Sequence, residues 1–315
     1  MKMSFALLLA MPWMFLPAAA QTTSSDPHQW KMRVTDTPIH ISEHVWMIKG
    51  NPNIAIVVGA RSVLVVDTGL GPKMGAMAAG FAEKLAPGKK LFLTTTHFHP
   101  EHAAGDKDFP ASTTLIRNDI QQMEVERYGM DMVKLFASRS ADNRELLQGT
   151  TFRTPDVTFH NEAKLDLGGG VIVSLLWLGP AHTEGDELTF VEPDATLISG
   201  DVVQNDTMPT IYTALGKGGT PTTWLHVVDK IAERHPTHVV PDHSEPGDGT
   251  LVASEHKLIA EIRTRALALK AHGVSADEAG KQVSATLKQE HPDWHSTDAS
   301  GVVRSVYQDP DTSAQ

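Results

Sequence analysis

The segment that most constrains this chain runs from Thr94 to His102 and reads TTTHFHPEH. Its first three residues end a run over residues 91–96 that is first apolar and then β-branched, and this run predicts a strand. Because side chains alternate along an extended chain, His97 and His99 are expected to face one way while Phe98 anchors the loop in the core. With Glu101 and His102, they form a dense set of nitrogen and oxygen ligands. Such a set suits Zn²⁺ or a similar transition ion.

Further polar side chains follow other predicted strands at the points where those strands end. His182 follows the run 171–178, Asp201 follows 196–199, and His243 follows 237–240. Since α/β sheets gather their sites at the carboxyl ends of strands, we expect these three side chains to complete the metal site.

The composition excludes several other kinds of site. The chain of 315 residues has 16 histidines, no cysteine and a formal net charge of -11. Thiolate-bound zinc, iron–sulfur clusters, disulfides and cysteine nucleophiles are therefore excluded. The acidic balance, without any run of Lys or Arg, predicts that nucleic acid is not a partner. A small-molecule substrate is expected instead, and the oligomeric state is left open.

The N-terminus is predicted to be a targeting segment. Residues 1–20 combine Lys2, an apolar stretch and a final run of three alanines. This pattern is typical of a secretory signal peptide cut after Ala20, and the apolar stretch is too short and too interrupted by proline for a membrane span. We expect a periplasmic or secreted protein with no membrane association after cleavage.

The remaining chain alternates between short β-type runs and helical segments. Residues 21–36 are predicted to be a flexible leader, 37–250 a layered α/β domain, and 251–310 a helical extension packed on that domain. The triplet Gly168-Gly169-Gly170 enters a strand, which favours a hairpin turn over a phosphate loop. Strands are predicted at 44–49, 54–58, 62–67, 91–96, 171–178, 187–191, 196–199 and 237–240, and helices at 71–85, 118–138, 221–235, 251–272 and 275–290.

Together, these segments resemble the metallo-β-lactamase superfamily. The motif His97-x-His99-x-Glu101-His102 is similar to that family's His-x-His-x-Asp-His signature, with Glu in the place of the usual Asp. The segments around His182, Asp201 and His243 resemble its later ligand motifs in the same order. The resemblance covers roughly residues 38–250. It implies an αββα four-layer sandwich, in which two mixed β-sheets lie face to face with helices outside.

The resemblance also implies a role for each residue. His97, His99 and His182 would hold one metal ion, and a second set would hold another: Glu101, His102 and His243. Asp201 would bridge the two ions, while Asp67 would order the metal loop without being a ligand. Glu101 would also orient or deprotonate the attacking water. The expected cofactor is Zn²⁺, with two ions favoured, and one ion, iron or manganese remain open.

The function expected from these features is metal-dependent hydrolysis of an ester, thioester, lactone or amide, with a metal-bound hydroxide as nucleophile. A β-lactamase is the first alternative, because β-lactam drugs act in the periplasm. A periplasmic metal-binding protein without catalysis is the second, and an iron-dependent redox branch of the family is the third. Thiolate-using β-lactamase subclasses are excluded by the lack of cysteine.

Overall fold

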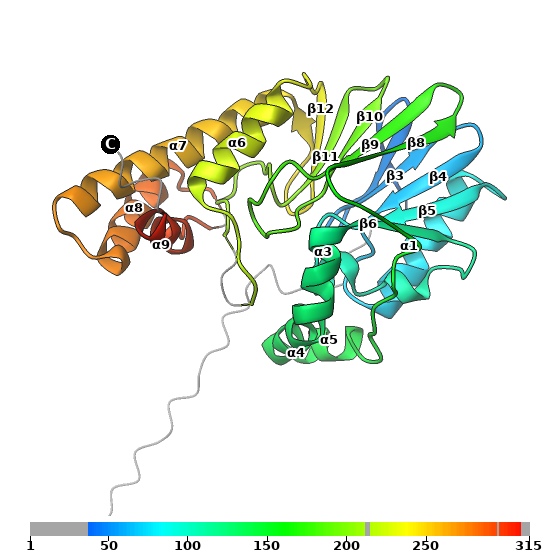
Figure 1. The fold of residues 1–315 in the computed structure, drawn as a ribbon, viewed down its shortest axis with the longest axis horizontal. Coiled ribbons are helices and arrows are strands. Elements are labelled where there is room, and N and C mark those ends of the chain that lie inside the picture. Colours follow the sequence, from blue (N-terminus) through cyan, green and yellow to red (C-terminus); the bar gives the residue numbers. More distant parts are fainter. Residues whose placement is uncertain (1–36, 212–214, 295, 310–315) are drawn as a thin grey trace, which may run out of the picture.

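The computed structural model describes residues 37–211, 215–294 and 296–309. The predicted signal peptide and leader therefore lie outside the described residues. The described strands form two sheets (Figure 1). The first contains β1 (Ile39–Ser42), β2 (Val45–Ile48), β3 (Ile54–Val58), β4 (Ser62–Val66), β5 (Lys90–Thr94), β6 (Thr114–Asn118) and β7 (Val157–Phe159). The second contains β8 (Glu162–Gly168), β9 (Val171–Leu176), β10 (Leu188–Glu192), β11 (Thr196–Gly200), β12 (His238–Pro241) and β13 (Gly247–Asp248).

Both sheets are mixed. In the first, the strands follow chain order, with antiparallel pairing from β1 to β4 and parallel pairing from β4 to β7. In the second, the order is β13-β12-β11-β10-β9-β8, and the pair β11 and β12 is parallel. Since β10 is antiparallel to both β9 and β11, strands β9, β11 and β12 run in one direction. Their carboxyl ends therefore meet at one edge of the sheet.

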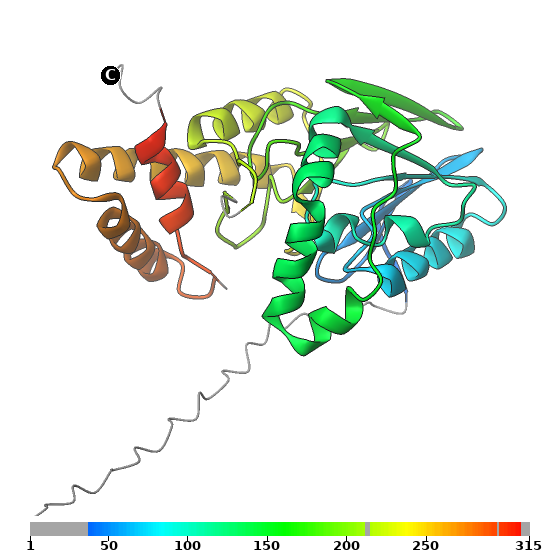
Figure 2. The same cartoon turned by 60° about the horizontal axis from the view of Figure 1, so that its bottom comes forward.

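The helices lie on the outer faces of the two sheets and at one end of the molecule (Figures 1 and 2). In the first half of the chain they are α1 (Pro72–Leu85), α2 (Pro100–Ala103), the short 3₁₀ turn Asp106–Asp108, α3 (Asp119–Glu124), the π-helical turn Val125–Gly129, α4 (Met130–Arg139) and α5 (Ala141–Leu146). In the second half they are α6 (Pro221–Ala232), α7 (Thr250–Ala271), α8 (Ala276–Glu290) and α9 (Ser300–Gln308).

Alternating apolar residues bury both faces of each sheet. On β3, Val57 packs between the sheets with Leu175 of β9, whereas its neighbour Ile56 packs outward with Ala82 of α1. On the far side, residues of the second sheet form a third cluster with α6, α7 and α9. The layers thus stack in space in the order helix, sheet, sheet and helix, so the predicted αββα sandwich is confirmed.

Most of the predicted elements occur within a few residues of the expected bounds. The glycine triplet forms the turn between antiparallel β8 and β9, with positive φ at Gly168, Gly169 and Gly170. The single helix expected over 118–138 is instead divided by the π-helical turn, although Asn118 caps its start by accepting from the backbone N–H of Gln121. The elements that were not predicted are the strands β1, β6, β7, β8 and β13 and the helices α2, α5 and α9. Strand β8 alternates charged and apolar residues at a sheet edge.

Candidate metal centre

The histidine loop begins where β5 ends. The strand finishes at Thr94, two residues earlier than predicted, and the chain then bends through His97 to His99 before α2. Phe98 is 1% exposed and packs in an apolar cluster that includes Leu70 and Phe136. This anchoring leaves the rings of His97 and His99 with centroids 4.5 Å apart. The predicted division between a core-facing Phe98 and two converging imidazoles is thus present.

Three imidazoles converge at the first end of the site. Nε2 of His97 lies 2.9 Å from Nδ1 of His99, which lies 3.3 Å from Nε2 of His182. Each of these residues is 3% exposed or less. Zinc–nitrogen bonds of about 2.0 Å at tetrahedral angles require ligand nitrogens about 3.3 Å apart. The three nitrogens therefore fit one tetrahedral ion, and their side chains form a potential metal-binding group.

Glu101, His102 and His243 form a second potential metal-binding group next to the first. Nε2 of His102 lies 3.2 Å from Nε2 of His243 and 3.9 Å from Oε1 of Glu101. Oε2 of Glu101 is buried and has no hydrogen-bond partner. A buried carboxylate oxygen without a donor is costly, so it also favours a cation at this place.

Asp201 lies between the two groups. One carboxylate oxygen is 3.3 Å from Nε2 of His182, and the other is 3.3 Å from Nε2 of His243. Asp201 directly follows Gly200, where φ is +55° and a Cβ atom would approach the side chain of Thr96 to 2.8 Å. Glycine at this position therefore allows Asp201 to approach the histidine loop closely. Each of the two carboxylate oxygens of Asp201 thus lies next to a histidine of a different group.

In His102, His182 and His243, the ring nitrogen that faces away from the other ligands is Nδ1. Each Nδ1 contacts a partner that the sequence did not predict. Nδ1 of His182 contacts the backbone oxygen of Thr210 at 2.5 Å, and Nδ1 of His243 contacts Oδ1 of Asn51. Nδ1 of His102 lies 3.2 Å from Asp242. Such contacts fix the tautomer and direct the other nitrogen to a metal. Asp242 directly precedes His243 in the sequence, but Asn51 lies 192 residues away from it.

Asp67 contacts both ends of the histidine loop. It is fully buried, with φ at +73°, and its Oδ1 accepts from the backbone N–H of Thr96 at 2.7 Å. Its Oδ2 lies 3.0 Å from Nδ1 of His102. Asp67 thus holds the histidine loop at Thr96 and at Nδ1 of His102, whereas Nε2 of His102 faces His243. Asp67, His102 and Asp242 also form a potential metal-binding group.

Burial and neighbouring charges divide the site into neutral and charged groups. Burial, and then the nearby imidazoles, hold the pKa values of His97 and His99 well below the usual range. Neutral imidazole is the form that binds metals. Burial would lower the pKa of His102 as well, but Asp67 and Asp242 outweigh it and raise that pKa. Burial raises the pKa of Glu101 to about 7.

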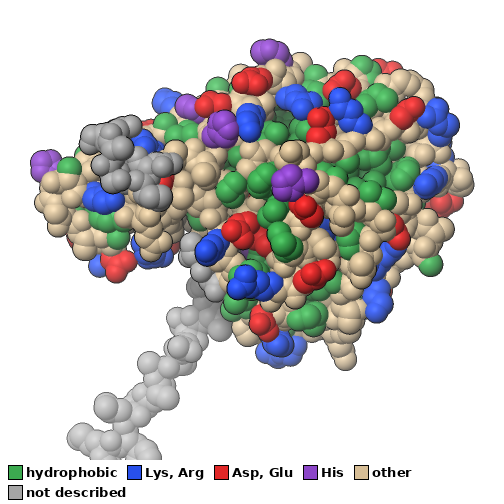
Figure 3. Space-filling model, viewed as in Figure 1, with side chains coloured by type: hydrophobic (Ala, Val, Ile, Leu, Met, Phe, Trp, Pro, Cys, Tyr) green, Lys and Arg blue, Asp and Glu red, His purple; other side chains and the backbone are tan. Residues whose placement is uncertain are grey.

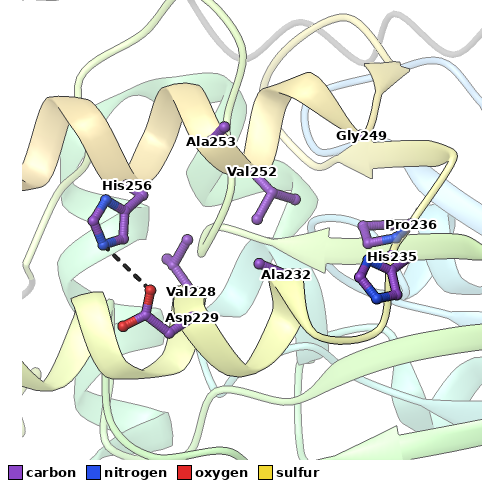
Figure 4. A pocket seen from close by; sticks show the side chains of 9 residues that line it. All are labelled: Val228, Asp229, Ala232, His235, Pro236, Gly249, Val252, Ala253 and His256. Atoms are coloured by element: carbon purple, nitrogen blue, oxygen red, sulfur yellow. Dashed lines mark ion pairs between the residues drawn. The ribbon is translucent and has the colours of Figure 1, made fainter.

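A cavity of about 200 Å³ opens beside the two groups. His182, Asp201 and His243 form its polar wall, and Met208 and Pro209 contribute apolar surface. It is a place where a small substrate could reach the converging side chains. A separate cavity of about 470 Å³ lies between α6 and α7, where His256 pairs with Asp229 at 3.3 Å (Figure 4). Its lining contains none of the predicted metal ligands.

Comparison with protein families assigns the chain to a class. The family model of the metallo-beta-lactamase superfamily matches residues 47–243, which include all eight predicted site residues. The chain therefore belongs to the metallo-β-lactamase superfamily, and the predicted resemblance is confirmed. This membership agrees with the predicted class, a metal-dependent hydrolase.

Individual relatives narrow the comparison. The chain is 24% identical over 261 residues to a linear primary-alkylsulfatase of Pseudomonas sp. (strain ATCC 19151), covering 72% of this chain and 49% of the relative. The chain thus spans about half the length of this curated relative. Among solved structures, the inverting sec-alkylsulfatase Pisa1 from Pseudomonas sp. matches with a TM-score of 0.67 at 16% identity, over 86% of this chain and 50% of that one. A metallo-beta-lactamase from Pontibacter korlensis matches with a TM-score of 0.56 at 18% identity, over 71% and 98%.

The distribution of charged side chains on the surface is relevant to the prediction that nucleic acid is not a partner. On the face shown in Figure 3, Lys and Arg side chains are interspersed with Asp and Glu, without a continuous basic stripe. Among the described residues, no helix combines the length and apolarity needed to cross a bilayer.

Proposed function

We propose that this protein is an exported hydrolase of small-molecule esters that works with two divalent metal ions, and that alkyl sulfate esters are its first candidate substrates. The observation that carries the proposal is the convergence of two potential metal-binding groups on either side of Asp201. Export is supported by the N-terminal sequence, with its charged start, apolar stretch and final alanines.

Each side chain has a defined task in this scheme. His97, His99 and His182 would hold one ion, and Glu101, His102 and His243 would hold the other. Asp201 would contact both ions. Zn²⁺ is the proposed metal, because imidazole and carboxylate ligands suit it. Such ions lower the pKa of water to about 7 and polarise the substrate oxygen.

The chain's own residues then orient the reactants. Asp67 and Asp242 fix the ring of His102, while Thr210 and Asn51 fix the rings of His182 and His243. Glu101 has a free Oε2 with which to orient the attacking water and accept its proton. The reacting group of the substrate would enter through the cavity beside Asp201.

The alkyl sulfate proposal is supported by the two alkylsulfatase relatives. Pisa1 matches over a larger share of this chain than the β-lactamase from Pontibacter does, 86% against 71%. Hydrolysis of β-lactams is the second candidate, supported by the same fold in that β-lactamase. A carrier without catalysis is disfavoured because the related proteins are hydrolases.

A substrate panel on protein of known metal content tests the proposal. Purified protein is analysed for zinc, iron and manganese and then incubated with octyl sulfate, p-nitrophenyl acetate and a chromogenic cephalosporin. We expect sulfate release from octyl sulfate, loss of this activity with a chelator, and its return with Zn²⁺. Turnover of the cephalosporin alone would favour the second candidate. Two bound ions without turnover of any substrate would contradict the proposal.

A further inference from the structure

A third cavity lies next to the loop that follows Asp201. It has a volume of about 290 Å³ and is enclosed by residues 204–207, by α7 and by the segment after α8. It shares Gln204 and Thr207 with the cavity at the metal centre. The loop 204–207 is therefore a common wall of the two cavities. None of the predicted metal ligands lines this third cavity.

Glu255 of α7 is the unusual group in this cavity. The residue is 2% exposed, and its Oε2 accepts a hydrogen bond of 3.3 Å from the backbone N–H of Gln204. Its Oε1 is buried without any hydrogen-bond partner. Burial raises the pKa of Glu255 to about 8. A buried carboxyl oxygen that lacks a donor, as Oε1 does, favours a ligand that supplies one.

The other groups that line the cavity indicate which donor fits. Asp206 and Glu261 add two carboxylates, against one amine from Lys257. Glu261 already pairs with Arg265, so Asp206 and Glu255 are the acidic groups to which a ligand can bind. Leu251, Leu258 and Trp294 supply apolar walls. A protonated amine on a short hydrocarbon complements this combination of carboxylates and apolar surface.

A chain of hydrogen bonds connects this cavity to the metal centre. The side-chain amide of Gln204 donates to Oδ1 of Asp201 at 3.2 Å and to the backbone oxygen of Gly200 at 3.1 Å. Its Oε1 accepts from Ser244, which directly follows His243, at 2.9 Å. Glu255 holds the backbone of the same glutamine. Gln204 thus contacts both Glu255 and Asp201, the predicted bridging carboxylate.

We propose that the cavity between the loop 204–207 and α7 is a binding site for a primary ammonium group carried on a short hydrocarbon, with Glu255 as its carboxylate partner. Glu255 releases its carboxyl proton to solvent as the ammonium binds. The ammonium then donates to Oε1 of Glu255, and the hydrocarbon packs against Leu258 and Trp294. The site is formed by this chain alone, and binding to it does not depend on the hydrolytic function proposed above.

Direct binding measurements test the site. Phenethylamine is titrated into the full-length folded protein by calorimetry at pH 7, and 2-phenylethanol serves as the uncharged probe of similar shape. We expect the amine to bind at least tenfold more tightly than the alcohol. Equal binding of the two probes, or no binding of the amine, would overturn the proposal and leave Glu255 as a hydrated buried acid.

Variants separate Glu255 from the rest of the cavity. Glu255→Gln keeps the size of the side chain, and we expect it to remove the preference for the amine. Glu261→Gln is the matched control, because this acid lines the same cavity but already has Arg265 as a partner. The proposal predicts that it changes amine binding less than threefold. Ser254→Arg places a guanidinium at an exposed lining position and should also weaken amine binding at least tenfold. Unchanged binding in Glu255→Gln or in Ser254→Arg would contradict the assignment.

An activity measurement distinguishes two sources of the amine. If the amine is part of the substrate, phenethylamine should inhibit hydrolysis competitively in the wild-type protein and not in Glu255→Gln. If it belongs to a separate effector, phenethylamine should change kcat without competing with substrate. Both results require binding at Glu255, whereas inhibition that persists in Glu255→Gln contradicts it. An absence of turnover would contradict the hydrolase proposal and leave the calorimetric test intact.

Discussion

The two metal-binding groups differ in chemistry and in burial. The group of His97, His99 and His182 consists only of imidazoles, each 3% exposed or less. The group of Glu101, His102 and His243 contains a carboxylate, and the His243 side chain is 22% exposed. The ligand atoms of the first group lie within 3.3 Å of their neighbours, whereas Glu101 remains 3.9 Å from His102. The first group is thus more completely formed by folding alone, and the second has more freedom to adjust.

Removing an imidazole from the first group should have the largest effect. We expect His182→Ala to lose one metal ion and to lower kcat/KM roughly a thousandfold, because bound metal supplies several kcal/mol of transition-state stabilisation. Metal analysis and steady-state kinetics measure this. His256→Ala, which removes a partly exposed imidazole outside the site, is the control. Full activity in His182→Ala would show that His182 is not a metal ligand.

Removing an imidazole from the second group should have a smaller effect. His243→Ala is expected to reduce the metal content by one ion, retain the first ion, and lower kcat/KM roughly a hundredfold. The exposed side of His243 allows water to replace part of its function. Loss of both ions together would show that the two groups form one cooperative site and would contradict the difference between them.

The supporting acid Asp242 should affect the second group selectively. Asp242→Asn keeps the size of the side chain but weakens its hold on Nδ1 of His102, 3.2 Å away. Metal affinity at the second group should fall about tenfold to a hundredfold, as is typical of the outer partners of a ligand. Metal titration measures this, with Asp248→Asn as an exposed control. An equal loss at the first group would show that Asp242 acts on the whole fold.

The loop that carries His182 should make the stability of the fold depend on pH through Glu124. Glu124 accepts the backbone N–H groups of Glu184 and Gly185, and burial and then Asp186 raise its pKa to about 8. The folded protein therefore keeps a proton that the unfolded chain releases above about pH 4.5. Its contribution to stability falls as pH rises from about 4.5 to 8, by up to about 1.4 kcal/mol per unit.

Glu124→Gln removes this titration, so the free energy of unfolding should fall less steeply with pH than in the wild type. Urea unfolding of metal-free protein at pH 5.5 and 7.5 measures the difference. Glu126→Gln, on the exposed side of the same helical segment, is the matched control. Equal slopes in the wild type and in Glu124→Gln would contradict the assignment.

The smallest effect is expected from shortening Glu101. Glu101→Asp withdraws the carboxylate by about one C–C bond, roughly 1.5 Å, from a position already 3.9 Å from His102. Metal affinity at the second group should weaken about threefold to tenfold, while that of the first group stays unchanged. Glu101→Gln, which keeps the length but loses the charge, separates reach from charge. Tighter binding in Glu101→Asp would show that Glu restricts the second group.

Local sequence patterns predicted many of the helices and strands, and the elements that they did not predict have physical explanations. The apolar runs of β3 and β4 and the helical composition of α1 predicted those elements closely. The edge strand β8 was missed because only alternate residues are buried. The π-helical turn was also missed, since nothing in its composition separates it from the helices on either side.

The order of His97, Glu101, Asp201 and the other predicted ligands along the chain was enough to indicate the superfamily and an αββα sandwich. This was possible because each ligand follows a recognisable strand, and strand direction dictates where its carboxyl end lies. Apart from Asp67, only the tertiary structure decided which groups support those ligands. Asn51 and His243 meet across 192 residues, and Glu255 reaches Gln204 across 51 residues. Such contacts depend on how two sheets and a helix pack together, and no local spacing in the sequence encodes that packing.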